Sequence, residues 1–230
     1  MKKYSFLFVF FTILFTACLL TANIVAVKVI SLFGLFVPAG IIIFPISYIL
    51  GDILTEVYGY ENTRSIIWLG FLANLLMVIV IFIAQHMPSA PFWSNQSSFD
   101  SILGYTPRLL LASFTAFLVG SFANSFVMSK MKLITKGRML WTRTISSTAV
   151  GEGLDSFIFI SIAFIGIFSF NNLIFLILTQ WGIKTLYEII ATPLTYGVVG
   201  YLKKREKMDT YDYKANYNPF ALEVLNTDKS

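Results

Sequence analysis

The stretch FPISYILGDILTEVYGYENTR, from Phe44 to Arg64, is an apolar run that ends in acidic residues and a turn. Asp52 and Glu56 are four residues apart, so a helix through the stretch presents both carboxylates on one face. Tyr58-Gly59-Tyr60 has the composition of a turn, and Arg64 opens a second apolar run. The pattern therefore predicts two antiparallel helices that meet at a polar corner.

The composition of the whole chain places this corner in a membrane protein. Of the 230 residues, 57% are hydrophobic and 13% are charged, and the mean hydropathy is +0.75. A hydrocarbon layer about 30 Å thick takes about 20 helical residues. Stretches of that length are predicted at 4–26, 35–54, 64–85, 107–130, 143–168 and 172–202. We therefore expect an all-α integral membrane protein, with one six-span domain over residues 1–203 and a tail over 204–230.

Positive charges predict the orientation of the spans, because lysine and arginine gather in cytoplasmic flanks. Three groups of them fall on one side of a six-span chain: Lys2 and Lys3; Lys130, Lys132, Lys136, Arg138 and Arg143; and Lys203, Lys204, Arg205 and Lys207. Both termini and the tail are therefore expected in the cytoplasm. This topology accounts for the net charge of +5, so nucleic acid is not an expected partner.

Ionisable side chains inside the predicted spans are the strongest functional signal, because in hydrocarbon they usually face a partner or a cavity. Glu152 and Asp155 share one helical face, and Lys184 and Glu188 share another. Counting about 1.5 Å per residue from the cytoplasmic ends places Asp155 about 17 Å and Glu188 about 21 Å deep. The two charged faces are therefore expected at nearly the same level of neighbouring antiparallel spans.

Three carboxylates against one lysine leave this group unbalanced. In a purely structural network, Lys184 would neutralise Glu188 and one acid of the preceding span. At least one acid would still have to be protonated, solvated in a cavity, or waiting for a cationic or hydrogen-bond-donating ligand. A ligand site is the interpretation favoured here.

Other polar and aromatic side chains extend this candidate substrate site. Asn23 and Asn74 are amides within predicted spans, where helix bonding and ligand binding are equally plausible roles. Trp181 and Tyr187 flank Lys184 and could stack on a planar ligand. The sequence offers no glycine-rich phosphate loop and no cysteine or histidine set for a metal, so no cofactor is predicted.

The same depth count places Asp52, Glu56 and Arg64 at the cytoplasmic ends of their spans. Two interpretations stay open for them. One is a structural ion network in which a carboxylate pairs with Arg64, and the other is a cytoplasmic gate or proton path.

The longer run FPISYILGDILTEVYGYENTRSIIWLGFLAN resembles the signature of the queuosine precursor transporter family, which is related to vitamin-uptake transporters. Residues 151–156, residues 184–188 and Asn218-Pro219-Phe220 are similar to later motifs of that family. The resemblance implies a six-helix bundle in a bacterial inner membrane, similar to the substrate-binding components of energy-coupling-factor transporters. The implied substrates are 7-cyano- or 7-aminomethyl-7-deazaguanine, or queuine.

These substrates suit the chemistry of the buried charges. A guanine-like edge presents two neighbouring N–H donors, which one carboxylate, Glu152 or Glu188, can accept. Lys184 or an asparagine amide would donate to the neighbouring carbonyl. Asp155 would face a protonated aminomethyl arm.

For the mechanism, the resemblance implies a solitary secondary carrier or facilitator without an ATPase module, with proton coupling through the excess carboxylates as one version. The alternative is the binding subunit of an energy-coupling-factor complex that borrows an ATPase pair. An intramembrane carboxylate enzyme is not favoured, because Glu152 and Asp155 share one helix instead of facing each other from two. The sequence is compatible with a monomer and with a homodimer.

Overall fold

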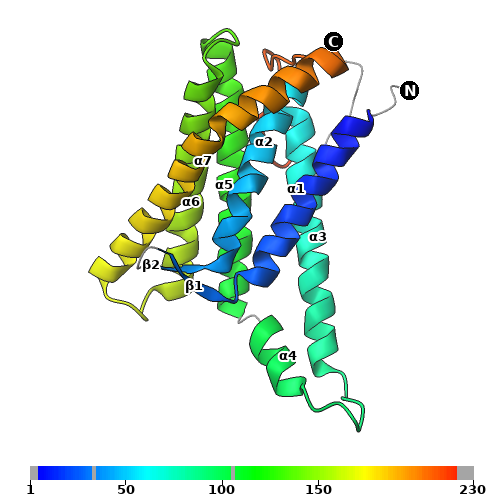
Figure 1. The fold of residues 1–230 in the computed structure, drawn as a ribbon, viewed down its shortest axis with the longest axis vertical. Coiled ribbons are helices and arrows are strands. Elements are labelled where there is room, and N and C mark those ends of the chain that lie inside the picture. Colours follow the sequence, from blue (N-terminus) through cyan, green and yellow to red (C-terminus); the bar gives the residue numbers. More distant parts are fainter. Residues whose placement is uncertain (1–4, 33–34, 105–106, 222–230) are drawn as a thin grey trace.

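The structure, a computed structural model, describes residues 5–32, 35–104 and 107–221. It is a bundle of helices with one short β-hairpin (Figure 1). The elements are α1 (Phe6–Val25), β1 (Val29–Leu32), β2 (Leu35–Pro38), the short 3-10 helix η1 (Ala39–Ile42), α2 (Phe44–Tyr58), α3 (Tyr60–His86), α4 (Gln96–Leu103), α5 (Pro107–Ile134), α6 (Leu140–Phe164) and α7 (Phe170–Glu206).

Within the described residues, six helical segments are long and apolar enough to cross a membrane. They contain α1, η1 with α2, α3, α5, α6 and α7. The six predicted spans are therefore confirmed in number and order. Helix α4 lies in the connection between α3 and α5 and has no buried residue.

The β-hairpin corrects the predicted start of the second span. Residues 35–38 were expected to be helical, but they pair with β1 in antiparallel register, Val29 opposite Pro38 and Leu32 opposite Leu35. The Ala39 amide closes the hairpin by donating to the Lys28 carbonyl at 2.7 Å. Strands of four residues are too short to show a two-residue alternation, and a short apolar run therefore cannot be told from a helix segment.

The predicted corner between the second and third spans is present at Gly59. This residue has φ +85°, a conformation that glycine adopts without a steric penalty, and a Cβ there would lie 2.8 Å from Asp212 Oδ1. Helix α2 continues to Tyr58 and α3 starts at Tyr60, so the two helices are joined by one residue. Asp52, Glu56 and Arg64 consequently lie inside helices.

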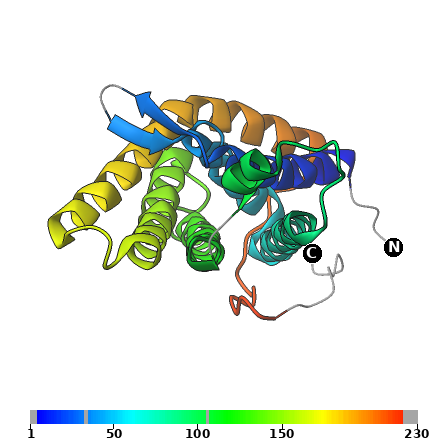
Figure 2. The ribbon, with the colours of Figure 1, turned by 90° about the horizontal axis from the view of Figure 1, so that it is seen from below.

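Helix α2 is the central element of the bundle. Every one of its residues from Ser47 to Tyr58 is buried, and Figure 2 shows it between the row of α6, α5 and α3 and the pair of α7 and α1. The main apolar cluster, which includes Phe15, Leu19, Leu54 and Ile67, joins α1, α2 and α3. The two acids of α2, Asp52 and Glu56, therefore lie on a helix that offers them no contact with solvent.

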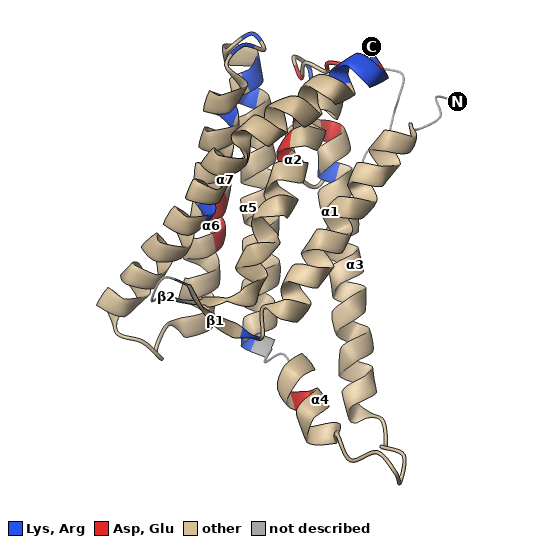
Figure 3. Ribbon diagram, in the orientation of Figure 1, with Lys and Arg blue, Asp and Glu red and all other residues tan. Residues whose placement is uncertain are grey.

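The charged residues gather at two levels (Figure 3). Many of the lysines and arginines lie at the end of α5, on the α5–α6 connection, at the start of α6 and in the last turns of α7, and we call this end of the bundle the basic end. A second group lies well inside the bundle on α6 and α7. Two of the three predicted basic groups thus share one end; Lys2 and Lys3 lie outside the described residues. The compartment that the basic end faces remains a prediction.

Candidate functional site

The charged residues inside α6 and α7 form a buried group that we call the Lys184 triad. Lys184 Nζ donates to Asp155 Oδ2 at 2.6 Å and lies 2.7 Å from Glu152 Oε2. The contact between Lys184 and Glu152 is close enough for an ion pair, but its angles are not those of a hydrogen bond. Asp155 and Lys184 are each 6% exposed and Glu152 is 0% exposed, so the three charges depend on one another for neutralisation.

Glu188 is not part of this triad. The structural network considered from the sequence, in which Lys184 neutralises Glu188 and one acid of the preceding span, is therefore not the one observed. Lys184 contacts both acids of α6, and no ion-pair partner of Glu188 is found in the described parts of the chain. Glu188 is 1% exposed, and neither of its carboxylate oxygens has a hydrogen-bond partner there. The Thr148 hydroxyl lies beside it but does not have hydrogen-bond geometry.

Glycines explain why α5 and α6 approach closely enough to place the triad. A Cβ on Gly120 would lie 2.9 Å from Asp155 Cβ and 2.9 Å from the Gly151 carbonyl oxygen. A Cβ on Gly151 would lie 2.6 Å from Asn124 Cβ. These separations are below van der Waals contact, so only glycine allows this helix spacing and the present position of Asp155.

We expect Gly120→Ala to destabilise the protein by about 1–3 kcal/mol, because the added methyl group must displace the backbone of α6 or the Asp155 side chain. Thermal unfolding of the purified protein in detergent measures this. Gly197→Ala on α7 is the matched control, since nothing lies within 4 Å of a Cβ there. Equal unfolding temperatures for the two variants would contradict this account of the helix spacing.

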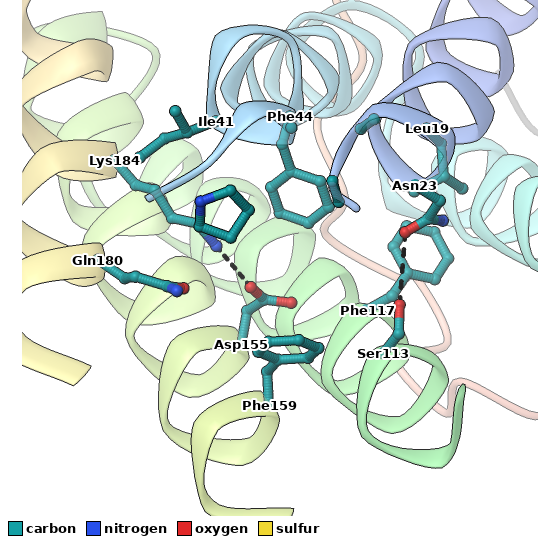
Figure 4. A pocket seen from close by; sticks show the side chains of 14 residues that line it. Leu19, Asn23, Ile41, Phe44, Ser113, Phe117, Asp155, Phe159, Gln180 and Lys184 are labelled. Carbon is teal, nitrogen blue, oxygen red and sulfur yellow. Dashed lines mark hydrogen bonds and ion pairs between the residues drawn. The ribbon is translucent and has the colours of Figure 1, made fainter. Parts of the chain in front are cut away.

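A cavity of about 100 Å³ opens next to the triad (Figure 4). Five parts of the fold line it: α1, the segment from Pro38 to Phe44, α5, α6 and α7. Its polar side chains are Asn23, Ser113, Asp155, Gln180 and Lys184, and its aromatic side chains are Phe44, Phe117 and Phe159. Ligand sites usually combine a mostly apolar wall with a few convergent polar groups, and this cavity has that character.

The polar groups of the cavity lie on two sides of it. On one side, the Lys184 ammonium lies 2.6 Å from Asp155 and 4.5 Å from the centre of the Phe44 ring, with Gln180 nearby in Figure 4. On the other side, the Asn23 amide donates to Asn74 Oδ1 at 3.0 Å, and its oxygen accepts from Ser113 at 3.5 Å. A planar ligand with donors and acceptors on different edges could engage both sides.

The cavity contains some of the predicted substrate-binding residues and not others. Asn23, Asp155 and Lys184 line it, while Glu152 and Asn74 contact its lining residues from behind. Trp181 donates from Nε1 to the Ala149 carbonyl at 2.8 Å, and Tyr187 packs against the apolar core. Neither aromatic residue lines the cavity.

Of the lining residues that were missed from the sequence, three lie close to the Lys184 triad: Phe44, Phe159 and Gln180. Phe159 follows Asp155 by four residues and Gln180 precedes Lys184 by four, so both lie one helical turn from a predicted residue on the same face. This four-residue spacing was the feature of the sequence from which Phe159 and Gln180 could have been predicted. Phe44 lies at the start of α2, and only the tertiary structure brings it beside Lys184.

Asp52 lies on the central helix and is paired by neutral groups. It accepts from Asn124 Nδ2 at 2.7 Å and from Ser147 Oγ at 3.0 Å, and it is fully buried. Asn124 and Ser147 belong to α5 and α6, so this carboxylate joins three helices.

Glu56 is the centre of an ion network at the basic end, which we call the Glu56 cluster. Arg143 donates to both carboxylate oxygens, from Nε at 2.9 Å and from Nη2 at 2.7 Å, and Lys203 donates at 2.5 Å. Lys132 lies 3.6 Å from Glu56 Oε1 and 2.5 Å from Asp209 Oδ1. The cluster thus connects α2, α5, α6 and α7 to the segment after α7.

Arg64 has a different role from the one expected in an acidic corner. Its Nη1 donates to the carbonyls of Asn216 and Asn218, at 2.7 and 3.0 Å. Within the described ranges no carboxylate pairs with it, so it does not join Asp52 and Glu56 in one network. Arg64 instead anchors the chain after α7 to α3.

That segment, residues 207–221, is docked on the basic end, and we call it the C-terminal strap. Asp212 accepts from the Tyr60 amide at 3.0 Å and from Ser129 at 2.5 Å. Trp68 Nε1 donates to the Pro219 carbonyl at 2.8 Å, and Lys130 Nζ lies 3.8 Å from the centre of the Tyr217 ring. The strap therefore covers the basic ends of α3 and α5.

The charges around Asp209 make its own share of strap docking insensitive to pH near neutrality. Burial acts to raise the pKa of this carboxyl, but the ammonium groups of Lys132 and Lys203 outweigh burial and place the pKa below its ordinary value. A lowered pKa means that the contribution of Asp209 to stability is present above the pKa of the unfolded chain, about 3.9, and is lost only at lower pH. Docking through Asp209 is consequently complete between about pH 5 and 8.

Comparison with known proteins places the chain among transport proteins. The family described as "Putative vitamin uptake transporter" matches residues 38–198. A protein of Bacillus subtilis (strain 168) named "Probable queuosine precursor transporter" is 31% identical over 176 residues, which cover 76% of this chain and 77% of that protein. One of Haemophilus influenzae (strain ATCC 51907 / DSM 11121 / KW20 / Rd) with the same name is 26% identical over 125 residues, 54% of this chain and 51% of that protein. No solved structure matches the chain.

The matched range includes most of the site described above. The Lys184 triad, Glu188, Asp52, Glu56 and Arg64 lie within residues 38–198. Asn23, Lys203 and the C-terminal strap lie outside it. The charged interior thus belongs to the part of the chain on which the family match rests.

Proposed function

Because the chain belongs to the vitamin uptake transporter family, we propose that it imports queuosine precursors across a bacterial inner membrane. It is a multi-pass membrane protein, and two relatives bear the name of queuosine precursor transporters. The observation that carries the proposal is the cavity beside the Lys184 triad, which combines a carboxylate, an ammonium group and aromatic walls. The substrate class is a 7-deazaguanine with a cyano or aminomethyl group, or queuine.

Asp155 is the carboxylate that we assign to the substrate. It is the acid that lines the cavity, whereas Glu152 lies behind Lys184 and Glu188 lies outside the lining. A guanine-like edge with two neighbouring N–H donors fits the two oxygens of one carboxylate, and charge-assisted bonds of this kind are among the strongest in proteins. The sequence-based assignment of that edge to Glu152 or Glu188 stays an untested prediction.

The remaining groups of the cavity suit the other edges of the same ring. Lys184 and the Gln180 amide can donate to the ring carbonyl, and the Asn23 amide lies on the opposite side. Phe44 and Phe159 provide faces on which a planar ring stacks. A cavity of about 100 Å³ is smaller than the roughly 300–1,000 Å³ of common ligand sites, so binding requires the walls to move outward.

Asp155→Asn is expected to weaken binding of 7-cyano-7-deazaguanine about 10- to 150-fold, the equivalent of about 1.5–3 kcal/mol for a hydrogen bond to a charged group. Calorimetric titration of the purified protein, against a panel containing guanine and adenine, measures affinity and selectivity together. Asp100→Asn on the exposed helix α4 is the matched control. Unchanged affinity in Asp155→Asn would refute the assigned contact, and equal binding of adenine would refute the substrate class.

The Glu56 cluster and the C-terminal strap are proposed as the gate on the cytoplasmic side. The basic end is assigned to the cytoplasm by the distribution of lysine and arginine. The cavity lies toward the other end of α7, so opening to the cytoplasm requires these ion pairs and strap contacts to separate. Asp52, between the two sites, is assigned to the same pathway.

We propose that the carrier works alone, as a secondary carrier or facilitator. The competing proposal is a substrate-binding component of an energy-coupling-factor complex, with a fold like that of such components. Purification from native membranes in mild detergent separates the two, because only the second brings down an ATPase pair. The same sample distinguishes a monomer from a homodimer by its mass.

An intramembrane enzyme is the less supported reading. The structure brings carboxylates of two helices, Asp52 and Glu188, to the same region, which the sequence did not suggest. Neither of them lines the cavity, so a substrate held there does not reach both. Lys184 neutralises the two acids of α6, which suits binding more than general acid catalysis.

A further inference from the structure

Glu188 is a buried carboxyl group that the proposed substrate contacts do not use. It is 1% exposed, and both of its oxygens lack a hydrogen-bond partner in the described part of the chain. A carboxylate without a partner in such a site carries a large free-energy cost, whereas a protonated carboxyl does not carry the charge. The surroundings therefore favour a bound proton.

The level of Glu188 follows from the antiparallel packing of α6 and α7. Lys184 contacts Glu152, so Glu188, one turn further toward the basic end, faces the turn of α6 around Thr148. Ser147, next to Thr148, donates to Asp52 at 3.0 Å. Glu188 consequently lies between the Lys184 triad on one side and Asp52 on the other.

The charged groups that surround Glu188 are unbalanced toward negative charge. From α6 it is faced by Glu152, with Asp155 beyond it, and from α2 it is faced by Asp52, with Glu56 beyond. On α7 itself, Lys184 is occupied by the two acids of α6. Arg143 and Lys203 form ion pairs with Glu56 at the basic end, so neither of them neutralises Glu188.

Lys184 links the charge of Glu188 to the cavity. The two residues are four apart on one helical face, the spacing at which a lysine and a glutamate pair. When Glu188 holds a proton, Lys184 stays on Asp155 and Glu152, as observed. When Glu188 is ionised, it competes for the same ammonium group and draws it away from the cavity.

We propose that Glu188 binds the proton that drives import, so that the protein is a proton–substrate symporter whose proton leaves past Asp52 toward the Glu56 cluster. This inference rests on the proposed transport function and adds its energy source. The carboxylate takes one proton from the outer solution to become a neutral carboxyl, and it returns that proton to the cytoplasm after the substrate leaves. Since the proton organises the cavity for the substrate, the substrate must equally favour the proton.

The test uses the full chain in proteoliposomes with labelled 7-cyano-7-deazaguanine, which has no aliphatic amine to titrate. Wild-type protein should exchange the compound across the membrane without a gradient and should accumulate it at least tenfold when an inward proton gradient is imposed. Glu188→Gln, which mimics the protonated group, should retain exchange that no longer changes between pH 6 and 8, and should lose the accumulation. Asp100→Asn is the control for a removed acid elsewhere.

Accumulation by Glu188→Gln, or exchange by the wild type without gradient-driven accumulation, would overturn the inference and leave the transport function intact. Absence of exchange by the wild type would overturn the transport function itself. A second measurement does not depend on the variant: addition of the cyano compound to wild-type protein in weak buffer should take up little proton at pH 6, where Glu188 already holds its proton, and a fraction of a proton per substrate that grows as the pH is raised to 8.5, where part of the free protein is ionised at Glu188. No proton uptake would also overturn the inference.

Discussion

Lys184→Met is expected to lower uptake of queuosine precursors at least 100-fold. The substitution leaves Glu152 and Asp155 buried without their shared cation, and breaking a buried ion pair from one side costs about 3–5 kcal/mol. It also removes the ammonium group that lines the cavity. Uptake of a labelled precursor at matched membrane expression, together with thermal unfolding in detergent, measures both effects.

A compensated variant separates folding from transport. Lys184→Met combined with Glu152→Gln and Asp155→Asn removes all three charges, so thermal stability should return to within a few degrees of the wild type. Uptake should stay lost, because the carboxylate and the ammonium group are both absent from the cavity. Lys214→Met, at an exposed position, is the matched control. Near-normal uptake by the compensated variant would refute the triad as the substrate site.

Glu56→Gln is expected to destabilise the protein by a similar amount, about 3–5 kcal/mol, because the buried Arg143 loses its charged partner and Lys203 keeps only Asp209. With the size scaling of a chain of about 200 residues, this lowers the unfolding temperature by roughly 6–20 °C. The same substitution at Glu206 is the control, since the described residues hold no ion-pair partner for it.

The gate assignment adds a second readout to Glu56→Gln. The reporter is a cysteine in place of Met128, which is 0% exposed and lies next to Ser147. In the Glu56→Gln variant this cysteine should react faster with an impermeant maleimide, applied to the basic end, than it does in the protein that keeps Glu56. Cys18→Ser provides the background without the native thiol. Removal of residues 208–230 should increase the reaction in the same way, because the strap contacts of Arg64 and Lys132 are lost with it. Unchanged labelling in both variants would exclude this end as the gate.

The spans and the charged faces could be predicted from the sequence because both depend on local periodicity. Apolar runs of about 20 residues predict spans whatever their partners, and a spacing of three or four residues places Glu152 with Asp155, and Lys184 with Glu188, on shared faces. The same spacing would have found Phe159 and Gln180. The hairpin at residues 29–38 was missed, because strand pairing is a contact between segments and leaves no helical period.

Pairing of the charges was decided by the tertiary structure, since periodicity says which face a side chain occupies and not what it meets. Lys184 could pair with Glu188 on its own helix, yet the close approach of α6 presents two acids to it. Glu56 meets Arg143 and Lys203 from distant parts of the chain, while the nearby Arg64 is taken by carbonyls of the strap.

Six segments long and apolar enough to span a membrane, with acids and a lysine inside them, could be recognised in the sequence, because hydropathy and helical spacing are properties of single segments. Three features depend on tertiary packing instead: which acid lines the cavity, which one lacks a partner among the described residues, and the position of the polar corner of residues 44–64 beneath a docked strap. Those outcomes depend on how closely two helices approach, and that distance is set by residues far apart in the chain, such as Gly120 and Gly151.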